Sequence, residues 1–374
     1  MKILIVRLGA LGDIVHAVPA AAALRRAFPD AQIDWLVDAR HRTIVELVTV
    51  VDRVIVLERA TIGGWADVAR RMRQVRYDVA IDFQGLLKSA VLARASGARR
   101  VLGFSIWHLR EKTARPFYSQ TDDGSRRVPL QPDQDTGSVR DIGGVRLPPD
   151  HVIDKNLRLL RLLGVDDERV TFPLAHVESS ALEQLGTDSG GRGPFALINP
   201  GAAWPNKRWP AQRYGEIAAF LRDVGGLPSV ILWGPGEEAL ARTVADASDG
   251  AARIAPPTAI VDLLALSRAA SLMVSGDTGP LHLATAAGTP TVSLFGPTDP
   301  SRNGPWSPDD VTVSVFGACG CQYERRCRRQ EWCLGKLPVS EVTAAIQQRL
   351  TARRGVPLEP DRGGESRRQG DRHQ

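Results

Sequence analysis

Short apolar segments alternate with helical patterns along nearly the whole chain, and they do so in two separate series. In the first series, apolar runs and helix-like stretches alternate over residues 3–6, 14–28, 33–37, 54–57, 65–75, 79–81, 86–95 and 100–103. Strands that alternate with helices form βαβ units, so this pattern predicts a parallel sheet covered on both faces. A second series begins near residue 195, with strands expected at residues 195–198, 230–233, 272–274 and 291–295. The chain is therefore expected to be an α/β protein with two sheets.

Interruptions of this pattern divide the chain into regions. Residues 121–150 are rich in Asp, Gly, Pro, Gln and Arg and are expected to form a long surface loop. We place an N-terminal Rossmann-like domain at residues 1–185, with a Gly-rich linker after it, and a second one at residues 186–352. Residues 353–374 are expected to be a disordered basic tail. Ligands of open parallel sheets bind at the carboxyl ends of the strands, so the cleft between the domains is the expected site.

Charge and hydropathy exclude several classes of protein. The chain has 374 residues and a net charge of +6, of which +2 comes from six Arg and four acids in residues 353–374. So small an excess argues against a nucleic-acid partner. No run approaches the roughly 18 apolar residues of a membrane span, and the N-terminus does not read as an export signal. We therefore expect a cytoplasmic protein with reduced cysteines.

The first strand leads into a glycine-containing turn with the sequence RLGALGDI at residues 7–14. Gly9 and Gly12 permit a tight turn at the end of the strand, but the turn is not the dinucleotide fingerprint, because the middle glycine is missing. This absence counts against an NAD-dependent oxidoreductase. Asp13 stands where the next helix begins, so capping of that helix and a role in catalysis both remain open.

Two loops of the second series have the composition of a phosphate site. Lys207 lies in the sequence NPGAAWPNKRWP at residues 199–210, next to an expected helix start, where a cation and backbone amides suit a phosphate. Asp277 and Thr278 lie in SGDTGPLH at residues 275–282, where the amides of a helix start favour a diphosphate. A solvated basic turn and an ordinary capped turn are the respective alternatives.

Glu237 and Glu238 follow another expected strand of the second series. Either can accept hydrogen bonds from ribose hydroxyls, and either can equally serve as an acid in the first turn of a helix. Spacing alone does not choose between the two residues or between the two roles.

All four cysteines of the chain lie within fifteen residues, at Cys319, Cys321, Cys327 and Cys333. Four thiolates can bind zinc tetrahedrally, but the spacing is not the paired C-x2-C of common zinc sites. Metal binding, disulfide formation and free thiols therefore all remain open. No motif in the sequence requires a metal for catalysis.

Six motifs together resemble glycosyltransferase family 9, the ADP-heptose:lipopolysaccharide heptosyltransferases, and they occur in the order found in that family. They are GALGDIVH at residues 9–16, DFQGLLKS at 82–89, NPG at 199–201, KRWP at 207–210, SGDTGPLH at 275–282 and FGPTDP at 295–300. The resemblance extends from Met1 to about Leu350. It implies a GT-B fold, in which two Rossmann-like domains face each other. The C-terminal domain would hold mainly the donor, and the N-terminal domain would hold the acceptor.

The resemblance also implies an activity and roles for individual residues. The reaction would be an inverting, metal-independent transfer of heptose from ADP-heptose to the Kdo region of the lipopolysaccharide inner core, with peripheral contact to the inner membrane and no cofactor. On the acceptor side, the resemblance implies that Asp13 is the general base and that Gly9, Gly12 and Lys88 line the site. On the donor side, it implies that Lys207 binds the diphosphate and that Glu237 or Glu238 binds the ribose. It also implies a donor loop made of Asp277, Thr278 and Gly279, with His282 nearby.

Two features of the sequence leave alternatives within this interpretation. Ala202 and Ala203 stand where better-studied heptosyltransferases offer hydroxyl groups to the phosphates, and the divergent segment 121–150 leaves open an acceptor of the heptosyltransferase II kind. A nucleotide-sugar-binding protein without turnover is a further alternative. As a base, Asp13 would be weak at its ordinary pKa of about 3.9, unless burial raises that pKa.

Overall fold

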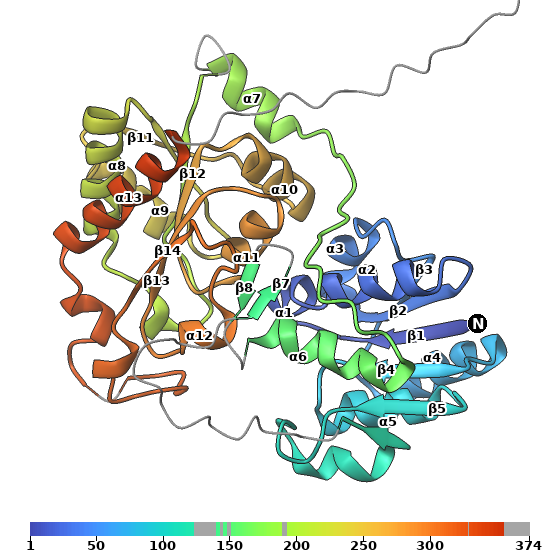
Figure 1. Cartoon of the computed structure of the whole chain (residues 1–374). Helices are drawn as coiled ribbons and strands as arrows, with labels where there is room; N and C mark the ends of the chain where they lie inside the picture. The colour runs from blue at the N-terminus through green and yellow to red at the C-terminus, as the bar shows by residue number, and fades with distance from the viewer. Residues whose placement is uncertain (123–139, 143–144, 148–150, 189–192, 328, 355–374) are drawn as a thin grey trace, which may run out of the picture.

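The computed structural model describes residues 1–122, 140–142, 145–147, 151–188, 193–327 and 329–354. Figure 1 shows two α/β halves lying next to each other, with the N-terminus at the outer edge of the first half. Among the described residues, no helix combines the length and the apolar character needed to cross a lipid bilayer.

Each half contains one parallel six-stranded sheet, and both sheets have the same strand order. The first sheet has the order β3 (Arg53–Leu57), β2 (Gln32–Asp38), β1 (Lys2–Val6), β4 (Val79–Asp82), β5 (Arg100–Gly103) and β6 (Gln120–Thr121). The second has the order β11 (Ala252–Ile254), β10 (Ser229–Ile231), β9 (Ala196–Asn199), β12 (Leu272–Gly276), β13 (Thr291–Phe295) and β14 (Val311–Ser314). The order 3-2-1-4-5-6 is that of a Rossmann sheet, so the predicted α/β architecture with two Rossmann-like sheets is confirmed.

Helices cover both sheets and connect them. Those of the first half are α1 (Leu11–Val15), α2 (Val18–Ala27), α3 (Arg42–Glu46), α4 (Ile62–Val75), α5 (Leu87–Ala95) and α6 (Val152–Leu159). The others are α7 (Ser180–Asp188), α8 (Ala211–Gly225), α9 (Glu238–Asp246), α10 (Ile260–Ala269), α11 (Gly279–Ala286), α12 (Pro300–Asn303) and α13 (Val339–Arg354). Short 3-10 turns include η2 (Lys112–Phe117), η4 (Pro205–Lys207) and η6 (Cys333–Lys336).

The central strands are buried on both faces, which explains why they appear as unbroken apolar runs rather than as alternating patterns. In β1, residues 3–6 are fully buried, and the four residues of β9 are buried as well. The hydrophobic core around the first sheet continues into the second half through Leu264 of α10 and Leu283 of α11. The two halves are therefore joined by apolar packing.

The structure differs from the sequence-based expectation at two helical stretches. Residues 14–28 were expected to form one helix, but the structure has α1 and α2, because Pro19 lacks the N–H that a continuous helix needs and instead occupies the first turn of α2. The predicted domain boundary after residue 185 falls inside α7, which packs against α10 of the second half. The chain has thus already reached the second half before that boundary.

Part of the segment expected to be a loop forms strands. β7 (Arg140–Ile142) and β8 (Val145–Leu147) pair antiparallel, with Arg140 opposite Leu147. The rest of residues 123–150 lies outside the described residues. So does the predicted basic tail beyond Arg354, where α13 ends.

Candidate active site

The four loops that carry most of the predicted site residues follow β1, β4, β9 and β12. In each sheet these are the two central neighbours, β1 beside β4 and β9 beside β12, where the order of the strands reverses. Loops at such a switch point diverge and leave a crevice at the carboxyl ends of the strands. The two switch points meet through α1 of the first half and α11 of the second, which pack against each other.

Glycines make the contact between α1 and α11 possible. A Cβ atom on Gly12 would overlap the imidazole of His282, and one on Gly279 would lie 2.9 Å from Leu11. Gly12, Gly279 and His282, predicted from the sequence as separate acceptor-side and donor-side residues, therefore meet at this contact. Gly9 lies beside His41 instead, since a Cβ there would come within 2.7 Å of that ring.

Asp13 lies in the first turn of α1 and forms an ion pair with Arg7. The Asp13 Oδ2 atom is 2.8 Å from Arg7 Nη2 and accepts a hydrogen bond from the Ala10 amide at 3.4 Å. It therefore binds the start of α1 without being the N-cap, and a third of its side chain is exposed. Burial by itself raises the pKa of Asp13, but Arg7, Arg110 and Arg302 together lower it below its ordinary value. The carboxylate is ionised, and it is a weak base.

Asp277 is the centre of a polar network under the start of α11. Its Oδ2 atom accepts hydrogen bonds from Lys207 Nζ at 2.5 Å and Thr298 Oγ1 at 2.6 Å. Its Oδ1 atom accepts from Asn303 Nδ2 at 2.8 Å and His282 Nε2 at 3.2 Å. Burial opposes the charge of Asp277, but the His282 and Lys207 contacts outweigh it and hold its pKa well below the usual range. Asp277 therefore acts as a buried anion that positions its neighbours.

Lys207 lies at the end of η4, with its ammonium group 4.6 Å from the centre of the Trp204 ring. Its side chain is 15% exposed. An ammonium group has three N–H donors, and Asp277 occupies only part of them. Thr278 is the N-cap of α11, and its hydroxyl accepts a hydrogen bond from Asn199 Nδ2 at 3.0 Å. A fixed cation and a helix N-terminus with its free amides thus lie together, which is the arrangement that binds a phosphate.

The structure separates the two glutamates that the sequence left undecided. Glu237 accepts hydrogen bonds from the Gly234 amide at 3.1 Å and from Arg208 Nη2 at 3.2 Å. It lies so close to Gly201 that any Cβ there would overlap its carboxylate. Glu238 instead forms an exposed pair with Arg242. Only Glu237 adjoins the loop that carries Lys207.

Lys88 is exposed on the first turn of α5 and makes no hydrogen bond or ion pair with any described residue. The structure therefore does not bring it into the network of Asp13 or Asp277. The other residues of its motif have structural contacts. Asp82 is buried and accepts hydrogen bonds from Ser89 and Tyr118, while Gln84 Oε1 accepts from the Leu8 amide at 2.8 Å. The motif thus fixes the loop after β1.

Sequence reasoning missed several residues that complete the site. Thr298 comes from the FGPTDP motif and Asn303 from the helix that follows it, and the sequence analysis assigned neither of them a role. Arg110 and Arg302 reach the surroundings of Asp13 from opposite halves, and no local pattern marks them. Their roles depend on contacts between segments far apart in the chain.

Three histidines meet between the halves. The ring of His16 lies 4.4 Å from that of His282 and 5.8 Å from that of His151, between centroids. Neither ring nitrogen of His16 has a hydrogen-bond partner among the described residues. Burial lowers the pKa of His151 to about 4 and that of His16 well below its ordinary value. Both rings are therefore neutral at pH 7 and serve as packing groups between the two halves.

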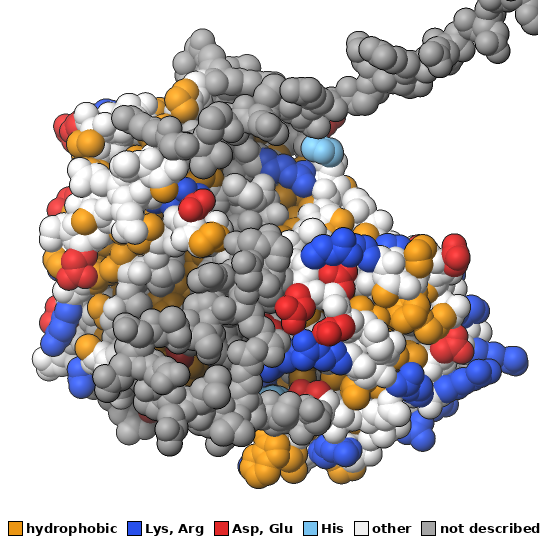
Figure 2. All heavy atoms as spheres, in the orientation of Figure 1, with side chains coloured by type: hydrophobic (Ala, Val, Ile, Leu, Met, Phe, Trp, Pro, Cys, Tyr) orange, Lys and Arg blue, Asp and Glu red, His pale blue; other side chains and the backbone are white. Residues whose placement is uncertain are grey.

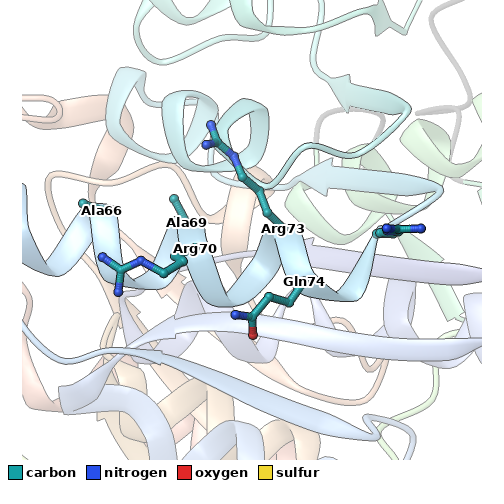
Figure 3. A pocket seen from close by; sticks show the side chains of 6 residues that line it. Ala66, Ala69, Arg70, Arg73 and Gln74 are labelled. Atoms are coloured by element: carbon teal, nitrogen blue, oxygen red, sulfur yellow. The ribbon is translucent and has the colours of Figure 1, made fainter.

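A pocket on the outer face of α4 lies apart from these loops (Figure 3). Its lining residues are Ala66, Ala69, Arg70, Arg73, Gln74 and Arg76, and no predicted site residue is among them. It is an open depression along one helix and lacks convergent groups from several elements. We therefore assign the site to the switch-point loops.

Comparison with known proteins agrees with this geometry. The family model of glycosyltransferase family 9 (heptosyltransferase) matches residues 65–129 and 137–333. The chain belongs to this family. It is 30% identical to lipopolysaccharide heptosyltransferase 1 of Pseudomonas aeruginosa, over 94% of this chain and 99% of that relative. It is 27% identical to lipopolysaccharide heptosyltransferase 1 of Escherichia coli K12, over 81% of this chain and 90% of the relative.

Solved structures show the same fold. E. coli heptosyltransferase WaaC with ADP matches with a TM-score of 0.70 and 22% identity, covering 93% of this chain and 100% of that one. E. coli ADP-heptose lps heptosyltransferase II matches with a TM-score of 0.69 and 20% identity, covering 95% and 100%. The predicted GT-B fold is confirmed, and the chain is a glycosyltransferase.

Proposed function

We propose that this glycosyltransferase transfers heptose from ADP-heptose to the Kdo region of the lipopolysaccharide inner core, with inversion at the anomeric carbon. One observation carries the proposal: the helix that bears the Asp13 carboxylate on the first half packs on a helix of the second half whose N-terminus adjoins a cation. Asp13 lies on α1, α1 packs on α11, and Thr278 is the N-cap of α11. Lys207 of η4 pairs with Asp277, the residue before Thr278. The names of the curated relatives support heptose as the sugar and lipopolysaccharide as the acceptor, while the ADP-linked donor and the Kdo region are our own proposal.

The proposed chemistry follows from this arrangement of Asp13 in one half and Lys207 in the other. An acceptor hydroxyl oxygen attacks the anomeric carbon, the bond from that carbon to the diphosphate oxygen breaks, and its electron pair leaves with ADP. Asp13 takes the hydroxyl proton as the new bond forms, which is general base catalysis. Because attack and departure occur on opposite faces of the sugar, the configuration inverts. The low pKa of Asp13 requires that the proton moves late, when the attacking oxygen has become acidic.

Charges of the protein stabilise the departing diphosphate. Lys207 and the N-terminus of α11 present positive charge that is already fixed in place before the reaction, by Asp277 and by Asn199. Preorganised charge of this kind is among the largest contributions to enzymatic rates. We therefore propose a chemical step that needs no metal ion and no cofactor. Glu237, held beside Gly201, is the proposed partner of the ribose hydroxyls.

The charges around Asp13 favour Kdo over a neutral heptose as the acceptor. Arg7 pairs directly with Asp13, and Arg110 and Arg302 add positive charge from both halves. Kdo carries a carboxylate, so an acceptor site with surplus arginines stabilises it.

The decisive assay offers both acceptors in parallel. The purified chain is incubated with ADP-heptose and either Kdo-lipid A or heptosyl-Kdo-lipid A, and the lipid products are analysed by mass spectrometry. We expect a gain of one heptose on Kdo-lipid A with stoichiometric ADP. Addition only to the heptosylated acceptor would assign a heptosyltransferase II activity instead. ADP-heptose binding without any product would refute turnover on these substrates.

We further propose that the chain contacts the inner membrane next to Asp13. Ile106 and Trp107 are exposed, Trp107 by 74%, and the exposed cations Arg110 and Lys112 follow in the same segment. The Leu87 amide at the start of α5 donates a hydrogen bond to Glu111 of this segment at 2.7 Å. Residues 106–112 therefore form an apolar and basic rim on the acceptor half. On the face shown in Figure 2, Lys and Arg side chains also gather mainly over this half.

Vesicle binding tests the rim. The affinity for vesicles that contain phosphatidylglycerol, measured by sedimentation, is expected to fall about tenfold in the double variant Trp107→Ser/Lys112→Ser. A basic residue contributes about 1 kcal/mol near an anionic surface, and the indole adds buried apolar area. Ile62→Ser, which removes a side chain that is 91% exposed at the start of α4, is the control and should bind like the wild type. Equal loss in both variants would contradict a specific rim.

A further inference from the structure

All four thiols of the chain converge on one point of the second half, away from the reacting groups. The Sγ atoms of Cys319, Cys321 and Cys333 lie within 4.8 Å of one another, and all three residues are buried. Cys327 packs against the same cluster and contacts Cys321. Cysteines that lie up to 14 positions apart in sequence are thus folded so that their sulfur atoms come together.

The spacing of the sulfurs fits a metal centre better than a disulfide. The Sγ atoms of Cys319 and Cys321 are 3.5 Å apart, and the four cysteines form no disulfide with each other. Zinc–sulfur bonds of about 2.3 Å in a tetrahedron place neighbouring sulfurs about 3.8 Å apart. A disulfide would need about 2.05 Å. Without a metal, four thiols packed together offer each other only weak hydrogen bonds.

The surroundings also suit a negatively charged thiolate centre. A Cβ atom on Gly320 would lie 2.7 Å from a guanidinium nitrogen of Arg329, so this cation lies directly at the turn between Cys319 and Cys321. The Asn206 Nδ2 group approaches Cys321 Sγ at 3.9 Å. A divalent ion with four thiolates carries a charge of −2, and a nearby cation and N–H donors stabilise such a charge.

The geometry points to a structural site in which Cys319, Cys321, Cys327 and Cys333 bind one thiophilic divalent cation, Zn²⁺ or Fe²⁺. Tetrahedral coordination by four sulfurs is typical of both ions. This site is separate from the proposed transfer reaction, which we assign to Asp13 and Lys207. The metal would act through the fold of residues 315–327 and 329–337.

That segment supports both loops of the donor site. Asn206, next to Lys207, is fully buried and donates a hydrogen bond to the Glu324 carbonyl at 2.9 Å. The Tyr323 amide donates to the Pro297 carbonyl at 2.7 Å, beside Thr298, which holds Asp277. A Cβ on Gly296 would lie 3.3 Å from Cys333 Sγ. A metal that orders the cysteine segment therefore also fixes the positions of Lys207 and Asp277.

The first test measures metal in the intact chain. The protein is purified under reducing conditions without an affinity tag that binds metal, and zinc and iron are quantified by mass spectrometry. We expect about one equivalent of one of these ions, and the same measurement distinguishes iron from zinc by mass. Replacement by Co²⁺ should give the charge-transfer and d–d bands of a tetrahedral thiolate site. Less than a tenth of an equivalent, together with no uptake of Co²⁺, would overturn the proposal.

Variants test the ligand set. Cys327→Ser, which changes the least buried cysteine, is expected to lose most of the bound ion and to lower the thermal midpoint by roughly 5 °C or more, because metal binding contributes folding free energy. Gln330→Ala lies exposed in the same segment and is the matched control, which should keep one equivalent. Retention of the full equivalent in Cys327→Ser and also in Cys319→Ser would contradict coordination by these thiols. A disulfide found by peptide mass mapping of the reduced-purified chain would contradict it as well.

Discussion

Asp13→Asn is expected to lower kcat for heptosyl transfer by about 10²- to 10⁴-fold, the usual contribution of a positioned general base, while the KM for ADP-heptose stays near the wild-type value. The amide has the same shape and can still accept a hydrogen bond from Arg7 and from the Ala10 amide. It cannot take a proton. Initial rates of ADP release at saturating donor measure the effect.

Asp38→Asn is the matched control for this substitution. Asp38 ends β2, the strand next to β1, and its carboxylate pairs with Arg40, so it is a carboxylate at the same edge of the same sheet. We expect its kcat to stay within about twofold of wild type. If Asp13→Asn keeps more than a tenth of the wild-type kcat, Asp13 is not the base.

The pKa of Asp13 also sets the pH range in which this proposed base is ionised. Arg7, Arg110 and Arg302 lower that pKa below its ordinary value, so Asp13 stays ionised throughout the range above pH 4. The acid limb of kcat/KM that belongs to this group therefore lies below about pH 4. An acid limb near pH 6 that disappears in Asp13→Asn would show that the pKa of Asp13 is not lowered in the substrate-free enzyme.

Local sequence patterns were sufficient to predict the fold class and the centre of each sheet. The alternation of short apolar runs with helices predicted nine of the twelve strands of the two sheets, because strands such as β1 and β9 are buried on both faces and leave an unbroken apolar signal. It did not predict β6, β11 and β14, which are edge strands of two to four residues and are not fully buried. The loops that carry the candidate site could also be predicted, because ligands bind at the carboxyl ends of such strands. Asp13, Lys207 and Asp277 stand in those loops, each next to glycine or proline residues that mark a turn.

Partners from distant segments were not predictable in this way. The sequence presented Lys207 and Asp277 as two separate phosphate-site residues, and only the fold shows that they pair at 2.5 Å. Thr298 and Asn303 bind the same carboxylate from a third segment. The hydrophobic periodicity of the sequence does not indicate such contacts, because they form only when the carboxyl ends of different strands come together in the fold. The cysteines are similar, because their spacing matched no familiar metal motif and their convergence appears only in three dimensions.

The ion pair between Lys207 and Asp277 makes Lys207→Met the second change with a large expected effect. In the proposed mechanism, loss of the cation removes charge that stabilises the departing diphosphate, and a single preorganised donor of this kind is worth about 10²- to 10³-fold in kcat. The same change leaves Asp277, 3% exposed, without its cation, which costs about 3 kcal/mol or more in stability. Lys336→Met, an exposed lysine of η6 in the same half, is the control and should change neither quantity.

A double variant separates the two roles of the lysine. Lys207→Met/Asp277→Asn removes both charges, so no buried anion is left uncompensated. The amide oxygen can still accept the hydrogen bond from Asn303, and the amide NH2 can donate to the Thr298 hydroxyl, which accepts as well as donates. The free energy of unfolding, measured by urea titration, should therefore recover most of the loss seen in Lys207→Met. The kcat should not recover, because the diphosphate still lacks its cation. If activity returned together with stability, Lys207 would act only by balancing the charge of Asp277, and stabilisation of the leaving group would have to come from the N-terminus of α11 alone.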